Sequence, residues 1–223
     1  MTDEIIPIKE HLKEENLNFD AIYTGYLGSE KQIDIVCDFI DDIKKENTLV
    51  VVDPAMADHG KLYAGFDESF SRKMAQLCKK ADILLPNVTE SAFILKKEYI
   101  AQGYNEDYIK DMLIGLCKLG AKEAVITGVS FEDKKIGVMG YNSETKEFYS
   151  YFKNKIEKIF HGTGDVFASC YCGCAVRGFS SRKSIETAVE FTNKSIEETL
   201  NEENPIWYGV NFEKALPFLI NNL

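Results

Sequence analysis

Apolar residues follow two alternating patterns along the first two thirds of the chain. Short continuous apolar runs, such as 48–52, are typical of buried parallel strands, which are apolar on both faces. Between such runs, apolar residues recur every three or four positions, as at Ile33, Val36 and Ile40, and this spacing marks one face of a helix. The alternation predicts an α/β fold, in which a largely parallel sheet is covered by helices on both faces.

The same patterns predict the individual elements. Strands are expected at 19–24, 48–52, 81–85 and 123–127, followed by a hairpin formed by 135–141 and 148–152. Helices are expected at 5–12, after a capping box at 29–32, at 68–79 and 105–119, from Thr163 onward, and at 181–200 and 212–221. No stretch has the composition of a linker, so we expect one domain over residues 1–223.

The strongest local signal for chemistry is the stretch Gly162-Thr163-Gly164-Asp165, which directly precedes a helical pattern. Glycine allows close approach of the backbone to a ligand, and a helix start offers free N–H groups that favour phosphate. Asp165 stands where a carboxylate could accept the proton of a hydroxyl that attacks this phosphate. An aspartate is equally typical of the first turn of any helix, so the motif alone leaves both interpretations open.

Polar residues also follow two of the predicted strands. Asp53 and Asp58 come after the second strand, and Asn87 and Glu90 come after the third. Open α/β sheets bind ligands beyond the carboxyl ends of their strands, and Mg²⁺ takes only one or two protein carboxylates, so Glu90 could hold Mg²⁺ through water. The alternatives are turn chemistry for the two aspartates and a helix N-cap for Asn87 with Glu90 as its partner.

The composition narrows the range of partners. The 223 residues are 45% hydrophobic and carry a formal charge of −10, which argues against nucleic acid or an anionic membrane as a partner. Positive charge for a phosphate site must therefore be supplied locally, by helix N-termini, a metal ion and a lysine such as Lys155. Lys155 could equally be an ordinary surface lysine. No signal peptide or long apolar run is apparent, which favours a cytoplasmic protein.

The six cysteines include a C-x-C-x-C run at Cys170, Cys172 and Cys174. Typical zinc spacings are absent, and on a helix Cys172 points away from the other two. The run is therefore interpreted as reduced thiols of the core.

Five motifs, taken in order, resemble those of the pyridoxal kinases in the ribokinase-like superfamily. They are Thr24-Gly25-Tyr26, Asp53-Pro54-x-Met56-x-Asp58, Pro86-Asn87-x-x-Glu90, Thr127-Gly128 and Gly162-Thr163-Gly164-Asp165. Each follows a predicted strand or opens a helix, and the similarity runs from about Phe19 to the end of the chain. The resemblance implies ATP-dependent phosphorylation of the hydroxymethyl group of pyridoxal, pyridoxine and pyridoxamine in vitamin B6 salvage.

On the substrate side, the resemblance implies that Asp165 is the catalytic base for the hydroxymethyl group. Gly162, Thr163 and Gly164 would form the anion hole for the transferring phosphoryl group, and Tyr26 would lie against the vitamin ring. On the nucleotide side, Asp58 and Glu90 would hold Mg²⁺, with room near the phosphates for a monovalent cation such as K⁺. The residues expected to serve Mg²⁺-ATP are Asp53, Asp58, Asn87, Glu90, Thr127, Gly128 and Lys155.

The chain departs from the family pattern in two places. Ala55 and Ala57 stand where the family more often has Val and Gly. Family members also carry several dozen residues ahead of the point that matches Met1, and these supply the first central strand, part of the ring pocket and a lid. We therefore expect a ribokinase-like fold that lacks this strand and lid. The chain is also expected to form a homodimer.

Two alternatives stay open beside the pyridoxal kinases. One is a hydroxymethylpyrimidine kinase, a similar family that usually has Cys in place of Asp165 and lacks the Thr-Gly-Tyr motif. The other is a truncated, non-catalytic nucleotide-binding protein.

Overall fold

The computed structural model describes residues 2–158, 160–205 and 208–222, and it divides into two compact units. The first unit comprises Met1–Ile126 and Gly140–Phe148, and the second comprises Thr127–Met139 and Tyr149–Leu223. Each unit is described by itself below. The expectation of a single domain over the whole chain stays a prediction.

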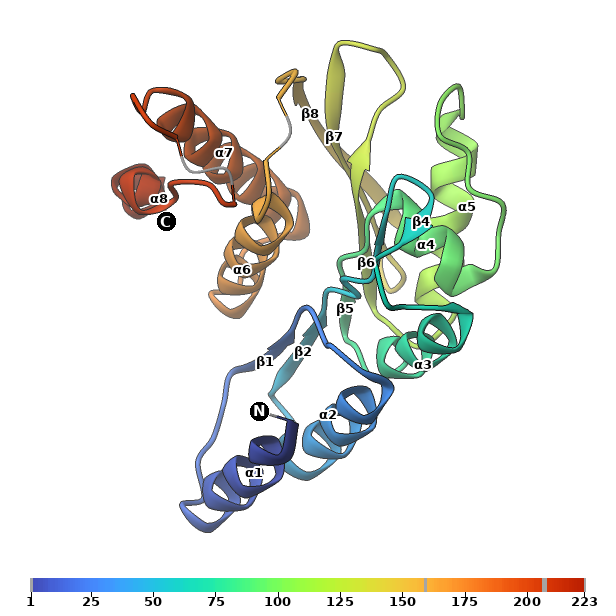
Figure 1. Ribbon diagram of the computed structural model, residues 1–223, viewed down its shortest axis with the longest axis vertical. Coiled ribbons are helices and arrows are strands. Elements are labelled where there is room, and N and C mark those ends of the chain that lie inside the picture. The colour runs from blue at the N-terminus through green and yellow to red at the C-terminus, as the bar shows by residue number, and fades with distance from the viewer. Residues whose placement is uncertain (1, 159, 206–207, 223) are drawn as a thin grey trace. The chain divides into compact units, whose positions relative to one another are not determined.

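The first unit is built on parallel strands. These are β1 (Ala21–Thr24), β2 (Leu49–Val52), β5 (Ile83–Leu84) and the start of β6 (Glu123–Val129). They pair in parallel in the order β1-β2-β5-β6 (Figure 1). The register sets Thr24 beside Val52 and Val52 beside Leu84, so three strands end at one level. The residues that follow them, which carry three of the predicted motifs, therefore leave the sheet at the same edge.

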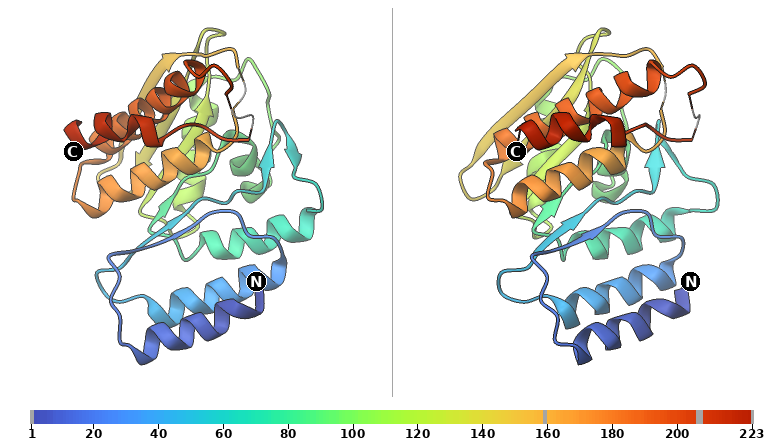
Figure 2. Two further views of the ribbon diagram at one scale, coloured as in Figure 1. Left: turned by 60° about the vertical axis from the view of Figure 1, so that its left-hand side comes forward. Right: turned by 90° about the vertical axis from the view of Figure 1, so that its left-hand side faces the viewer.

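The helices of the first unit pack one after another along the chain. They are η1 (Thr2–Glu4), α1 (Ile5–Glu14), α2 (Glu30–Ile43), α3 (Glu68–Cys78), α4 (Val88–Leu95) and α5 (Glu106–Cys117). Figure 2 shows α1, α2 and α3 lying side by side, and α4 contacts α3 and α5. Apolar faces such as Ile33 and Ile40 of α2 are buried, as the period predicted. Four helices begin at a side-chain N-cap: Ser29, Asp67, Asn87 and Asn105.

The capping box predicted at 29–32 forms only in part. Ser29 Oγ accepts a hydrogen bond from the Gln32 N–H at 3.2 Å, as expected. Gln32 Oε1, however, accepts the N–H of Gly28 at 2.6 Å instead of that of Ser29. The glutamine thus fixes the turn that carries Tyr26, because it holds the end of that turn against the first residues of α2.

The sequence patterns did not predict one short hairpin, which β3 (Ala57–Asp58) and β4 (Lys61–Leu62) form. Its turn residues His59 and Gly60 both have positive φ, at 49° and 77°, which two-residue hairpin turns with the right twist require. A Cβ at Gly60 would lie 2.7 Å from the ring of Tyr99. Strands of two residues are too short to show a hydrophobic period, so only the His-Gly pair could have indicated the turn.

The second unit contains the antiparallel part of the sheet and the last helices. Strands β7 (Lys135–Asn142) and β8 (Glu147–Asn154) continue the strand order from β6 and, like β6, contribute residues to both units. Helix α6 (Thr163–Val176) packs on α7 (Ser181–Leu200), which also contacts η2 (Glu213–Ala215) and α8 (Leu216–Asn222). The helix predicted at 212–221 is therefore a 3₁₀ turn that continues into a short α-helix.

These elements confirm the predicted α/β fold with a mostly parallel sheet flanked by helices. The cysteines of the C-x-C-x-C run lie in α6, and all three are free and buried. Cys172 is buried like the other two although it points to another side of the helix, so α6 is covered on more than one face. In the described part of the chain, no helix combines the length and the apolar character that a membrane span needs.

Candidate active site

The end of β2 places the first candidate carboxylate. Asp53 directly follows Val52, and its N–H donates to the carbonyl oxygen of Thr24 at 2.9 Å, so the turn after β1 and the loop after β2 begin side by side. Asp53 is only 8% exposed. The neighbouring Thr24 hydroxyl is buried and has no hydrogen-bond partner among the described residues. The carboxyl edge of the sheet thus holds a buried acid beside an unsatisfied hydroxyl, an arrangement more typical of a ligand site than of a packed core.

Glu90 is the most tightly held of the predicted site residues. Its side chain is buried, and Oε2 accepts the N–H of Asn87 at 2.8 Å. Oε1 accepts the N–H groups of Met56 at 3.0 Å and Ala57 at 3.5 Å. One carboxyl group therefore joins the N-terminus of α4 to the loop that follows β2.

Asn87 completes this junction from the other side. Its Oδ1 accepts the Glu90 N–H at 2.9 Å, and its Nδ2 donates to the carbonyl oxygen of Ala57 at 2.8 Å. Asn87 and Glu90 form a full capping box, so the structural alternative for this motif is realised. The box does not exclude a second role, because a carboxylate oxygen has more than one lone pair.

The electrostatics of Glu90 are unusual for a capping residue. Burial is the main cause that raises its pKa well above the ordinary value of 4.5, and the negative charge of Asp53 raises it further. The three backbone N–H bonds favour the charged form and oppose this shift. Asp53 raises the cost of ionising Glu90, and a cation near both carboxyl groups would lower that cost.

A magnesium ion fits this pair in number and type of ligand. Mg²⁺ takes one or two protein carboxylates and completes its shell with water and phosphate oxygens. The residues that the structure describes contain no group of three or more His, Cys, Asp or Glu side chains placed to hold a metal. Asp53 and Glu90 can thus supply the protein's share for Mg²⁺, whereas a site made wholly of protein ligands is not formed by the described residues.

Asp58 has a different environment from the buried pair. It lies on the β3-β4 hairpin, where its Oδ1 accepts the His59 N–H at 2.8 Å and its Oδ2 lies 3.5 Å from His59 Nε2. The turn chemistry proposed as its alternative role is therefore present. The hairpin is tied to α4, because the Gly60 N–H donates to Thr89 Oγ1 at 3.1 Å. Asp58 is exposed on this hairpin, and its predicted contact with a cation stays a prediction.

The turn after β1 presents an aromatic surface. Tyr26 is 61% exposed, and its ring stacks on Phe66 with centroids 5.7 Å apart. Phe66 in turn stacks on the buried Phe70 at 3.7 Å, and Tyr63 lies against Phe66 at 6.5 Å. Of these rings, only Tyr26 belongs to a motif that could be recognised from the sequence. The other three rings could have been suspected only from their clustering at 63–70, since their contact with Tyr26 joins two distant segments.

In the second unit, α6 begins as the glycine motif predicted. Gly162 is the N-cap with φ 77°, and Thr163, Gly164 and Asp165 form the first turn. A Cβ at Gly162 or Gly164 would meet no described atom within 4 Å, so the space beside these two glycines is open. Asp165 is exposed in this turn. A glycine-rich helix start with open space beside it is suited to a phosphate group.

The remaining predicted contacts of ATP also lie in the second unit. Thr127 and Gly128 belong to the end of β6, where Gly128 has φ 71° and is open to solvent. Lys155 follows β8, and its backbone N–H donates to the carbonyl oxygen of Lys134 at 2.8 Å, while its side chain is exposed. The structure thus groups Tyr26 and the four acidic and amide residues in the first unit, and the glycine motif and these three residues in the second.

A family model described as phosphomethylpyrimidine kinase matches residues 8–207 of the chain. The chain belongs to this family. A solved structure of a provisionally named phosphomethylpyrimidine kinase from Bacteroides thetaiotaomicron is 35% identical, with a TM-score of 0.94 over 98% of this chain and 75% of the other. Pyridoxal kinase from Lactobacillus plantarum is 27% identical, with a TM-score of 0.87 over 99% of this chain and 77% of the other.

Among curated proteins, this chain is similar to the thiamine biosynthetic bifunctional enzyme TH1 of Arabidopsis thaliana. The two are 26% identical over 197 residues, which are 85% of this chain and 36% of that enzyme. The chain thus spans little more than a third of this relative's length. The likeness to solved pyridoxal kinases confirms the resemblance inferred from the motifs and the ribokinase-like fold.

Proposed function

We propose that this chain is an ATP-dependent kinase of vitamin B6, which phosphorylates the hydroxymethyl group of pyridoxal and also of pyridoxine and pyridoxamine. The observation that carries the proposal is the exposed ring of Tyr26, backed by Phe66 and Phe70 at the carboxyl edge of the sheet. A flat heteroaromatic ring gains most from stacking on such a surface. In further support, the 35% identical structure from Bacteroides thetaiotaomicron was also solved with pyridoxal.

The transfer step assigns a proton acceptor and a phosphate cradle to α6. The substrate's hydroxymethyl oxygen attacks the γ-phosphorus of ATP, its proton passes to the carboxylate of Asp165, and ADP leaves. The N–H groups of Gly162, Thr163 and Gly164 donate to the equatorial oxygens of the phosphoryl group. Phosphoryl transfer depends on positioning and charge neutralisation more than on a strong base, so a surface carboxylate is adequate.

The proposal assigns the remaining predicted residues to the nucleotide. Mg²⁺, when bound, would neutralise charge on the phosphates. Asp58 and Glu90 are the residues predicted to hold it, and Asp53, which is buried like Glu90, is suited to share it. A monovalent cation such as K⁺ would lie near the same phosphates. Asn87 holds the loop in place, as its two hydrogen bonds indicate. Complexes with ADP and with AMP-PNP of more distant relatives support ATP as the donor. Thr127, Gly128 and Lys155 would contact that donor.

A hydroxymethylpyrimidine kinase is the second candidate, because the family description and the thiamine biosynthetic relative favour it. Both substrates are planar rings with a hydroxymethyl group, so the aromatic surface alone accepts either. Asp165 and Tyr26 favour a vitamin B6 substrate. The hydroxymethylpyrimidine kinases usually have Cys where this chain has Asp165, and they lack the Thr-Gly-Tyr motif that contains Tyr26.

A direct comparison of substrates tests the proposal. The purified chain would be incubated with Mg²⁺-ATP and either pyridoxal or hydroxymethylpyrimidine, and the phosphorylated products would be separated and quantified by chromatography and mass spectrometry. We expect kcat/KM to favour pyridoxal. A preference for hydroxymethylpyrimidine would establish the second candidate, and binding of ATP with neither product would indicate a non-catalytic protein. Light scattering on the same sample would test the expected homodimer.

A further inference from the structure

A cavity of about 330 Å³ lies between α3 and α4 of the first unit, at the end of α4 opposite to Asn87. Because α4 has eight residues, this end is about 12 Å from the candidate active site. The volume is at the lower end of the range of about 300–1,000 Å³ for small-molecule sites. The cavity is lined by Glu68, Ser71, Arg72, Ala75, Ala92, Phe93, Ile94, Lys96 and Lys97.

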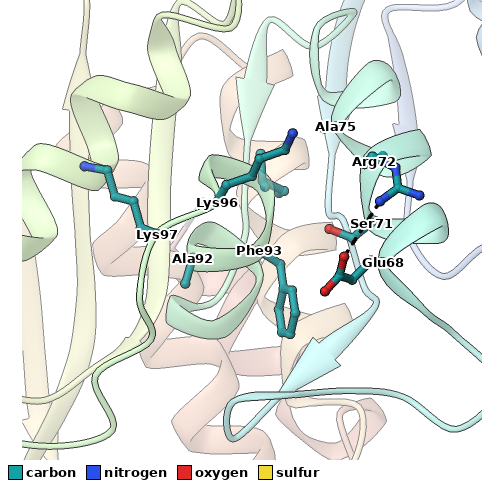
Figure 3. A pocket seen from close by; sticks show the side chains of 9 residues that line it. Glu68, Ser71, Arg72, Ala75, Ala92, Phe93, Lys96 and Lys97 are labelled. Carbon is teal, nitrogen blue, oxygen red and sulfur yellow. Dashed lines mark ion pairs between the residues drawn. The ribbon is translucent and has the colours of Figure 1, made fainter.

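Figure 3 shows how the charged side chains of this cavity are disposed. Lys96 and Phe93 project from the end of α4, and Glu68, Ser71 and Arg72 face them from α3. Lys97 points away, to its ion pair with Asp111 on α5. The cations that remain for a ligand are Arg72 and Lys96.

Arg72 has donors to spare. Its ion pair with Glu68 has a nitrogen–oxygen distance of 3.8 Å, which is longer than a charge-assisted hydrogen bond. A guanidinium carries five N–H donors in a planar fork that matches the oxygens of a phosphate. Lys96 is exposed in this cavity. Two cations thus line one cavity. The chain has more acidic than basic residues, with a net charge of −10, so two cations without a carboxylate at hydrogen-bonding distance among the described residues are unexpected here.

The backbone at Lys96 gives a second, independent observation. Lys96 is the C-cap of α4 with φ 53° and ψ 42°, the left-handed conformation in which helices often end and which glycine usually supplies. A residue with a Cβ is less stable there than glycine. The sequence nevertheless places a long cationic side chain at this position, where its conformation directs the ammonium group to the cavity (Figure 3).

We propose that this cavity binds a phosphate monoester that carries a planar ring. Arg72 and Lys96 neutralise the phosphate from opposite walls, the Ser71 hydroxyl donates to it, and the ring lies against Phe93. The site differs from the nucleotide and vitamin sites proposed above, and the inference does not depend on them. A ligand bound here joins α3 to the end of α4, and the start of α4 carries the Asn87–Glu90 junction.

The test uses phenyl phosphate as the probe and backbone amide NMR shifts as the readout. Saturating AMP-PNP and Mg²⁺ occupy the nucleotide site, so that shifts of the amides at 92–97 report on the cavity alone. We expect a saturable response there, weaker with inorganic phosphate because the ring contact is missing. Lys96→Gly should weaken phenyl phosphate binding about tenfold or more, yet leave the melting temperature equal or higher, because glycine suits this backbone.

The chain offers a matched control. Lys146 is also a lysine with positive φ, 62°, but it lies outside the cavity, so Lys146→Gly removes the same charge and relieves the same backbone conformation. It should bind phenyl phosphate as the unmodified chain does. Glu68→Gln should tighten binding, because it removes the acid that competes for Arg72. The proposal is overturned if the amides at 92–97 do not respond, or if the two glycine variants bind equally well.

Discussion

The junction at Glu90 makes the stability of the chain depend on pH in a predictable direction. The perturbation is Glu90→Gln, which keeps the shape of the side chain and removes its charge. In the unmodified chain, burial and the charge of Asp53 raise the pKa of Glu90 above the value of 4.5 that the unfolded chain has. Between the two pKa values the folded chain holds a proton that the unfolded chain has lost, so the free energy of unfolding falls as pH rises.

The structure also sets the scale of the change in Glu90→Gln. An amide has one oxygen, so it cannot accept from Asn87 on one side and from Met56 and Ala57 on the other, and at least one buried N–H loses its acceptor. Such a loss costs about 1–3 kcal/mol. At low pH this cost stands alone. At high pH the lost hydrogen bond is partly offset, because the unmodified chain must ionise the buried Glu90 whereas the glutamine of the variant stays neutral.

Urea denaturation at pH 5.0 and at pH 8.0, analysed by linear extrapolation, measures both effects. We expect Glu90→Gln to be the less stable chain by about 1–3 kcal/mol at the lower pH, with a smaller deficit at the higher pH. Adding Mg²⁺ and AMP-PNP at pH 8.0 should stabilise the unmodified chain more than the variant. A deficit that is the same at both pH values would refute the raised pKa and with it the proposed cation pair.

Three further predictions concern the turn, the hairpin and the sheet. Tyr26→Ala should raise KM for pyridoxal about tenfold while leaving KM for ATP nearly unchanged, which steady-state kinetics would show; equal effects on both would contradict a contact with the ring. Gly60→Ala should destabilise the chain more than Gly65→Ala, because both have positive φ but only the Cβ at Gly60 would meet Tyr99, at 2.7 Å; thermal melts that rank them the other way would contradict the hairpin. Asp82→Ala should cost about 1–3 kcal/mol in urea, since a β2 amide loses its 3.0 Å acceptor; a loss below the error of the fit would contradict that bond.

The elements that the sequence predicted are those with a strong period or a clear cap. The run 48–52 is buried and contains β2, and the helix expected at 105–119 is α5, with Asn105 as its N-cap. The β3-β4 hairpin lay beyond this reasoning, because its strands have two residues each and are fixed by contacts such as that between Gly60 and Thr89. The second half of the capping box at Ser29 does not form, because Gln32 Oε1 accepts the N–H of Gly28 and not that of Ser29. Which of the two N–H groups binds the glutamine cannot be read from a sequence pattern.

The candidate site shows the same division. The ends of β1 and β2 could be placed from the sequence, since parallel strands end at one edge, and the structure sets Asp53 beside Thr24 there. The role of Phe66 could not, because its stacking on Tyr26 depends on how the loop before α3 folds back. The bonds from Met56 and Ala57 to Glu90 were also unpredicted. They tie the cap of α4 to the loop after β2, while burial and the charge of Asp53 raise the pKa of Glu90.

The central claim is that Asp165 accepts the proton of a vitamin B6 hydroxymethyl group during phosphoryl transfer. The most direct test compares Asp165→Asn with Asp107→Asn, because Asp107 is also exposed in the first turn of a helix and undergoes the same change of charge. Formation of pyridoxal 5′-phosphate is measured with both variants under saturating Mg²⁺-ATP. The account predicts a loss in kcat of about a hundredfold or more for Asp165→Asn, unchanged binding of ATP, and full activity for Asp107→Asn. Near-normal turnover by Asp165→Asn would contradict it.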